Sequence, residues 1–215
     1  MRNPDQANNM TSKDLSSSTI ELRKYILSDD VTVDSEEFLP FAAAVEVLES
    51  TPTTIKNRIE TGEVLQKSFF LKGEKVKMYR GVKIGGVKKL MLKKMEQREV
   101  LRKHIMNCVA SQELTTYADA MDDADMNWRS PPDTKFCNHV LEEMSRESFE
   151  ETVDPGRPCL ITSIVVSKNE RIPTESYFSC AINLGLLEHE ATKEERYDFW
   201  KKQKELAFEL YGKNN

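Results

Sequence analysis

The chain has 215 residues, a mass of 24.7 kDa, a net charge of −5 and a pI near 5.4. Hydrophobic residues make up 39% of it, which suffices for a buried core and excludes a fully disordered chain. No run approaches the ~20 apolar residues of a membrane-spanning helix, and no secretory signal stands at the N-terminus. We therefore expect a cytoplasmic protein of one large or two small domains, with no membrane partner.

The net charge hides an uneven distribution along the chain. Residues 1–52 carry a net charge of −6, residues 53–107 carry +10, and residues 108–215 carry −9. A basic block inside an otherwise acidic protein argues against a non-specific nucleic-acid coat. It favours a basic binding unit held between two acidic segments.

The segment before the basic block is polar and acidic. Residues 1–18 are rich in Asn, Asp, Gln and Ser, and this composition predicts a flexible tail. Residues 19–28 have an amphipathic pattern, and the acidic residues 29–38 follow as a predicted loop. The first folded domain is expected to span residues 19–86.

Two short helices joined by a tight turn are predicted next. The Ala-rich segment 40–49 is a strong helix former with a proline near its first turn. A Ser-Thr-Pro-Thr segment breaks it, and Thr51 or Thr53 can cap a second helix over residues 54–61, which ends at Gly62. This arrangement is a helix-turn-helix whose second helix exposes polar and basic groups.

A hairpin and a long helix complete the basic block. Residues 64–71 and 76–84 are predicted strands around a turn at 72–75, and the second strand alternates apolar and basic residues. The glycine pair 85–86 is expected to separate the hairpin from a helix over residues 87–110. That helix has apolar residues along one side and basic residues elsewhere, so it can act as a connector or as a dimerisation helix.

Residues 39–84 carry the pattern Ala43-Ala44-x-x-x-Leu48, then Ser50-x-Pro52-x-Thr54-Ile55-x-x-x-Ile59-x-x-Gly62, then the basic hairpin. This pattern resembles the winged helix-turn-helix of excisionases and MerR-type regulators. In that family a recognition helix precedes a wing, and a long dimerisation helix often follows. The resemblance implies binding to double-stranded DNA and a homodimer through residues 87–110. Glu60 and Glu63 depart from the pattern, since they place negative charge close to the expected DNA surface.

The resemblance implies two kinds of DNA contact. The second helix lies where a recognition helix reaches base edges, and Arg and Asn pair well with guanine and adenine. Basic residues of the hairpin would hold phosphates and set the register on the duplex. The expected recognition residues are Thr53, Thr54, Lys56, Asn57 and Arg58, and the expected phosphate contacts are Lys72, Lys75, Lys77 and Arg80.

Residues 111–215 are predicted to form a second, small and acidic α+β domain, so the whole chain is expected to be α+β and mainly helical. The β-branched run 160–166 predicts a central strand. A capping box at Thr192-x-x-Glu195 predicts the start of a last helix that ends at Tyr211. Further helices are expected over residues 114–121, 133–148 and 174–187.

Thr115–Ala120, Pro158-Cys159 and Val165-Val166 loosely resemble the winged-helix part of alkyltransferase-like DNA repair proteins. Those proteins hold a reactive thiolate in a Pro-Cys-His-Arg motif, whereas Leu160 follows the cysteine here. Alkyl transfer is therefore rejected, and a second winged-helix-like unit is what the likeness implies. This half also resembles an uncharacterised bacterial domain with the pattern Thr-Tyr…Gly-Arg-Pro-x-Leu…Val-Val-x-Lys, which supplies no activity.

The chain offers little for catalysis or metal binding. Its four cysteines and three histidines lack the paired spacings of a zinc site, and the thiols are expected to be free. Asp119, Asp122, Asp123 and Asp125 lack the glycine turn and distal glutamate of a calcium loop, so a solvated loop is the prediction. No phosphate-binding glycine loop or hydrolase motif occurs. We expect no metal, no cofactor and no enzymatic activity.

Two functions fit these patterns. The first is sequence-specific binding of double-stranded DNA by a transcription regulator of a bacterium or its phage. The alternative is a partner-binding inhibitor, such as a phage-encoded counter-defence protein, in which residues 111–215 dock on a protein or imitate DNA. The basic block can also be a solvated face, or it can bind the acidic domain of its own chain. Residues 111–215 are the expected site for a protein partner under either function.

Overall fold

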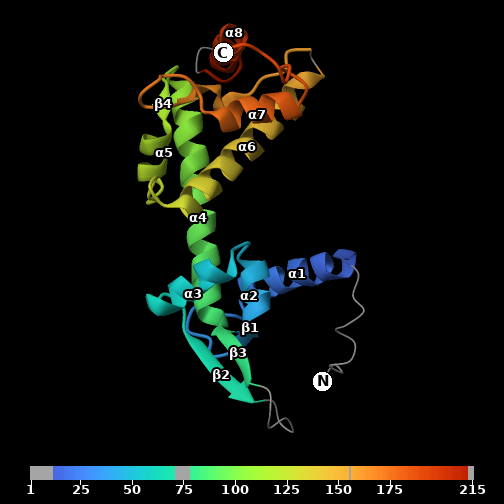
Figure 1. Cartoon of the computed structure of the whole chain (residues 1–215), viewed down its shortest axis with the longest axis vertical. Coiled ribbons are helices and arrows are strands. Elements are labelled where there is room, and N and C mark those ends of the chain that lie inside the picture. The colour runs from blue at the N-terminus through green and yellow to red at the C-terminus, as the bar shows by residue number, and fades with distance from the viewer. Residues whose placement is uncertain (1–11, 71–77, 155, 213–215) are drawn as a thin grey trace. The chain divides into compact units, whose positions relative to one another are not determined.

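The computed structural model describes residues 12–70, 78–154 and 156–212 (Figure 1). The described chain is α+β and mainly helical, which confirms the predicted fold class. It divides into two compact units, of which the first ends at Lys94 and the second begins at Met95. Helix α4 (Ile84–Ala110) supplies residues to both units.

Unit 1 contains one small antiparallel sheet with helices that precede and interrupt it. The strand order is β1-β3-β2, and the segment that joins β2 to β3, with the predicted turn at 72–75, lies outside the described residues. The elements before α4 are α1 (Ser12–Leu27), β1 (Phe38–Pro40), α2 (Phe41–Val47), α3 (Pro52–Glu60), β2 (Gln66–Phe70) and β3 (Met78–Lys83).

The order helix, turn, helix, hairpin follows the prediction, with shifted ends. Helix α1 begins at Ser12, so residues 12–18 are helical rather than part of a tail, and residues 1–11 of the predicted tail lie outside the described residues. Helix α3 begins two residues earlier than predicted, because Thr51 caps it and Pro52 occupies its first turn, where a missing N–H costs nothing.

The core of unit 1 lies between the sheet and the helices. Ile55 of α3 and Val82 of β3 are fully buried in one cluster, which also contains Ala44 of α2. The N-terminal extension belongs to this core as well, since Ile26 and Val31 are buried in the same cluster. The acidic segment before β1 is therefore part of the folded unit.

The glycine pair is not a separator. Gly85 and Gly86 lie inside the first turn of α4, so that prediction is wrong. The physical reason is close packing: a Cβ on Gly85 would stand 2.2 Å from the carbonyl oxygen of Val33. Only a residue without a side chain lets α4 begin against the backbone of the loop before β1.

Unit 2 is mostly helical, and its predicted capping box is confirmed. Thr192 Oγ1 accepts the N–H of Glu195, and the Glu195 carboxylate accepts the N–H of Thr192, which closes the start of α8. Its elements after α4 are β4 (Thr115–Thr116), α5 (Tyr117–Asp123), α6 (Pro131–Val153), the 3-10 turn η2 (Ile161–Ile164), β5 (Val165–Val166), α7 (Glu175–Asn183) and α8 (Lys193–Tyr211).

The predicted central strand over residues 160–166 is wrong. Only β5 is a strand, and it pairs in parallel with the two residues of β4. The preceding segment is buried, and side chains take the place of a neighbouring strand. Backbone N–H groups of Leu160 and Ile161 donate to Gln203 Oε1 of α8 and to Ser148 Oγ of α6, at 2.7 and 3.0 Å. Buried backbone groups are thus satisfied without a sheet.

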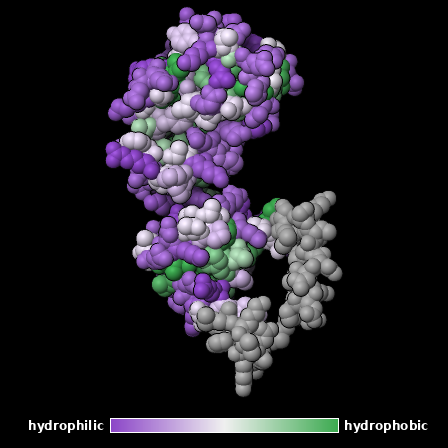
Figure 2. All heavy atoms as spheres, viewed as in Figure 1, coloured by the Kyte–Doolittle hydropathy of each residue, from purple (hydrophilic) through white to green (hydrophobic). Residues whose placement is uncertain are grey.

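The surface of unit 2 is mostly polar on the face shown in Figure 2, whereas hydrophobic residues are more visible over the helices of unit 1. The large apolar side chains exposed in unit 1 include Leu65, which is 59% exposed, and Leu92. Among the described residues, no helix is both long enough and apolar enough to cross a membrane.

Candidate nucleic-acid interface

Helix α3 presents its polar side because its apolar side is fixed in the core. Ile55 is fully buried and Ile59 packs against the same cluster. The helix start is closed by Thr51, whose Oγ1 accepts the N–H of Thr54 at 3.1 Å. The positions between these anchors, Thr53, Lys56 and Asn57, are exposed.

Of the five predicted recognition residues, three face solvent without a side-chain partner among the described residues: Thr53, Lys56 and Asn57. Thr54 is half-buried, and its hydroxyl lies 2.9 Å from that of Thr51. Arg58 is bound within the chain, because its Nη1 donates to Glu63 Oε2 at 2.7 Å. Three of the predicted recognition residues are therefore exposed, whereas the arginine already has a partner within the chain.

The hairpin places Arg80 on the same side of the sheet as the core. Arg80 pairs across the strands with Ser68, and Val82, two residues along, is fully buried beneath the helices. Side chains two residues apart in a strand point to the same face. Arg80 is nevertheless exposed. The other predicted phosphate contacts, Lys72, Lys75 and Lys77, lie outside the described residues.

The hairpin carries an exposed lysine, Lys67, that is not among the predicted phosphate contacts. Lys67 pairs with Gly81 in the register, so its side chain belongs to the opposite face from Arg80. Lys83 shares that face, and its Nζ donates to Glu36 Oε1 at 2.7 Å. The alternation of β2 could have placed Lys67, once the register with β3 was known.

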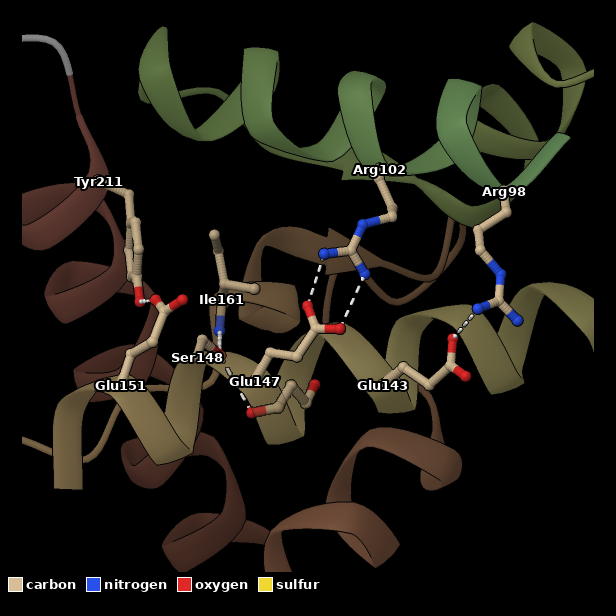
Figure 3. A network of polar contacts seen from close by, with 9 residues as sticks. Arg98, Arg102, Glu143, Glu147, Ser148, Glu151, Ile161 and Tyr211 are labelled. Carbon is tan, nitrogen blue, oxygen red and sulfur yellow. Dashed lines mark hydrogen bonds and ion pairs between the residues drawn. The ribbon is translucent and has the colours of Figure 1, made fainter. Parts of the chain in front are cut away.

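Much of the basic block is used inside the chain. Lys88 Nζ donates to the carbonyl oxygens of Ser28 and Val31 at 2.8 and 2.6 Å, and so ties α4 to the N-terminal extension. In unit 2, Arg98 and Arg102 point from α4 toward carboxylates of α6 (Figure 3). Part of the net charge of +10 carried by residues 53–107 is therefore bound within the chain and is not available to a partner.

Comparison with protein-family models, curated proteins and solved structures found no match.

Helix α4 uses its apolar side within each unit. Val87 and Met91 are buried in the core of unit 1, and Leu101 and Ile105 are buried in the core of unit 2. Met95, between these two pairs, is 51% exposed. A homodimer through residues 87–110 stays a prediction, and it would need the exposed side of this helix.

Unit 2 gathers a polar cluster that the sequence did not reveal. His104 Nδ1 lies 2.5 Å from Asp123 Oδ2, and His104 Nε2 lies 2.7 Å from Thr115 Oγ1 and 3.6 Å from Cys108 Sγ. Burial raises the pKa of the Cys108 thiol, which disfavours the thiolate form. The contacts join α4 to α5 and β4. Asp122 and Asp123 lie in α5, so the predicted solvated loop is wrong for these two residues.

Cys159 has the properties of a structural cysteine. It is fully buried, and burial raises its pKa to about 12. A thiol with so high a pKa is protonated at neutral pH and is a poor nucleophile. All four cysteines are free, as predicted.

Proposed function

We propose that unit 1 is a winged helix-turn-helix and that the protein binds double-stranded DNA sequence-specifically, as a transcription regulator of a bacterium or its phage acting in the cytoplasm. One observation carries the proposal. Lys56 and Asn57 are exposed on α3, and Arg80 is exposed on the side of the hairpin against which the helices pack. A duplex that receives α3 could therefore also meet Arg80.

The residue types suit base contacts from α3 and a phosphate contact from the hairpin. The amide of Asn57 can pair in a bidentate way with adenine, and Lys56 can donate to guanine acceptors in the major groove. Arg80 has the guanidinium geometry that matches a phosphate. Each phosphate that is neutralised releases counterions, so binding should weaken as salt rises.

The first test compares two basic residues of one hairpin. Arg80→Ala should weaken binding to a duplex selected from a randomised pool, and it should lower the salt slope of log K by about 0.9, because one phosphate contact is lost. Lys67→Ala removes the same charge from the opposite face and should leave both quantities close to the wild-type values. Fluorescence anisotropy at several NaCl concentrations measures both.

Two single substitutions on α3, Asn57→Ala and Lys56→Ala, separate the effect of base recognition from the effect of charge. Asn57→Ala leaves the charge unchanged and should lower affinity for the selected duplex by about 1–3 kcal/mol, with little change for the unselected pool. The proposal is wrong if the wild-type protein selects no sequence, or if Lys56→Ala and Asn57→Ala bind as the wild type does. A stoichiometric protein that is retained from nuclease-treated lysate, without DNA, would instead favour the partner-binding inhibitor.

A further inference from the structure

Glu63 makes ordered contacts at the end of the proposed recognition helix. Gly62 has a φ of 76°, a left-handed conformation that ends α3 and lets the chain turn back. Glu63 Oε2 then accepts a hydrogen bond from Arg58 Nη1 at 2.7 Å, and Oε1 accepts one from Thr61 Oγ1 at 3.4 Å. Both oxygens of this carboxylate are therefore engaged on α3 and its cap.

Arg58 is held while part of its guanidinium stays open. Its side chain is 27% exposed, and that of Glu63 is 50% exposed, so the pair lies at the surface. A guanidinium has five N–H donors, and Glu63 contacts only Nη1. Glu60, the last residue of α3 and two positions after Arg58, is exposed and makes no ion pair among the described residues.

We propose that Glu63 is a specificity-determining residue, whose carboxylate holds Arg58 in place of a DNA phosphate. This inference rests on the proposed function. Non-specific binding comes almost entirely from phosphate contacts, so a cation that is neutralised within the chain contributes less to it. Specific binding gains further energy from base contacts through Lys56 and Asn57, and depends less on Arg58. Glu63 thus lowers the affinity for wrong sequences more than for the right one.

The test replaces Glu63 by its neutral isostere. Glu63→Gln should bind an unselected pool of duplexes about two- to five-fold more tightly, a range set by the strength of exposed ion pairs. Its salt slope should steepen by about 0.9, because Arg58 gains one phosphate. The ratio of selected to unselected affinity should fall. Glu60→Gln makes the same charge change nearby, and should give a smaller gain with an unchanged salt slope.

The double variant Arg58→Ala/Glu63→Gln decides whether the effect runs through Arg58. The gain from Glu63→Gln should disappear in the Arg58→Ala background. The inference is overturned if Glu63→Gln and Glu60→Gln behave alike, if Glu63→Gln weakens binding to the pool, or if its gain persists without Arg58. When Lys56→Ala weakens binding but Glu63→Gln matches Glu60→Gln, only this inference fails. When the wild type binds no duplex, the proposed function fails with it.

Discussion

Two exposed basic residues of unit 1 differ in their surroundings from two that α4 brings to unit 2. In unit 2, Arg98 and Arg102 meet Glu143 and Glu147 of α6, at 3.2 and 2.5 Å (Figure 3). In unit 1, Lys56 and Arg80 meet no acidic group among the described residues. The same type of charge therefore forms ion pairs within the fold at Arg98 and Arg102, and stays exposed, without an acidic partner in the described part of the chain, at Lys56 and Arg80. The two pairs of residues differ in whether a carboxylate lies beside each cation. The net charge of a sequence segment cannot show this.

The two cores differ in composition as well. The buried cluster of unit 1 consists of aliphatic side chains and methionine. Unit 2 buries polar side chains in addition, among them Ser145, Ser148 and Gln203. Trp200 also contributes a polar contact there, since its Nε1 donates to the carbonyl oxygen of Ser163 at 2.7 Å. Order in unit 2 thus depends on directional bonds as well as on burial.

The largest expected effect comes from opening a cavity in either core. Ile105→Ala in unit 2 and Ile55→Ala in unit 1 each remove a fully buried side chain and should lower the free energy of unfolding by about 2–5 kcal/mol. No described residue belongs to the clusters of both units, so each loss should concentrate in its own unit.

The fluorescence of the protein can separate these two losses. Both tryptophans, Trp128 and Trp200, lie in unit 2, and Trp200 is 5% exposed. Denaturation followed by tryptophan emission should shift strongly for Ile105→Ala and weakly for Ile55→Ala, whereas amide exchange of α3 should show the reverse. Equal shifts of the two variants in both measurements would mean that the units unfold together.

A smaller effect is expected where α4 begins. Gly85→Ala would drive a Cβ against a backbone oxygen of the loop before β1, and should destabilise unit 1 by about 1–3 kcal/mol. Gly86→Ala is the matched control, since its Cβ would come no nearer than 3.3 Å to an atom outside α4, the Cγ1 of Val64. Amide exchange of residues 31–35 should rise in the first variant. The packing argument is refuted if Gly86→Ala is the more damaging of the two.

The features that the sequence predicted well depend on neighbouring residues. The Thr192 capping box and the end of α3 at Gly62 each involve contacts within a few positions, and the sequence contains the whole signal. The helix-turn-helix order and the exposed face of α3 follow from the spacing of Ile55 and Ile59 in the same way.

The features that it missed depend on contacts between distant residues. The run 160–166 has strand propensity, but Gln203 satisfies a backbone N–H 43 positions away and keeps that segment out of a sheet. The sequence predicted that Gly85 ends the hairpin and precedes the helix, because the residue it packs against, Val33, is far away in the sequence. In the candidate site, the sequence alone predicts that Lys56 is exposed. The face of the sheet on which Arg80 lies follows only from the register of β2 and β3.

The smallest expected effect tests the paired cations of unit 2. Arg102 donates to both oxygens of Glu147, at 3.2 and 2.5 Å, and the two side chains are 32% and 51% exposed. A double-mutant cycle with Arg102→Ala and Glu147→Ala should give a coupling energy of about 0.5–1 kcal/mol, the upper part of the range for exposed pairs, because the contact is bidentate. A cycle of Lys103→Ala with Glu147→Ala should give no coupling, since Lys103 is exposed and has no partner among the described residues.

The salt dependence of the coupling energy connects this last measurement with the comparison of the two regions. The coupling between Arg102 and Glu147 should fall as NaCl rises, because solvent ions screen partly exposed pairs. The proposed DNA binding through Arg80 should weaken over the same range for a different reason, the uptake of counterions by the freed duplex. Since the carboxylate of Glu147 already neutralises Arg102, Arg102→Ala should leave the salt slope of DNA binding unchanged, while Arg80→Ala lowers it. A slope that falls equally in both variants would show that the ion pair with Glu147 does not withdraw Arg102 from DNA.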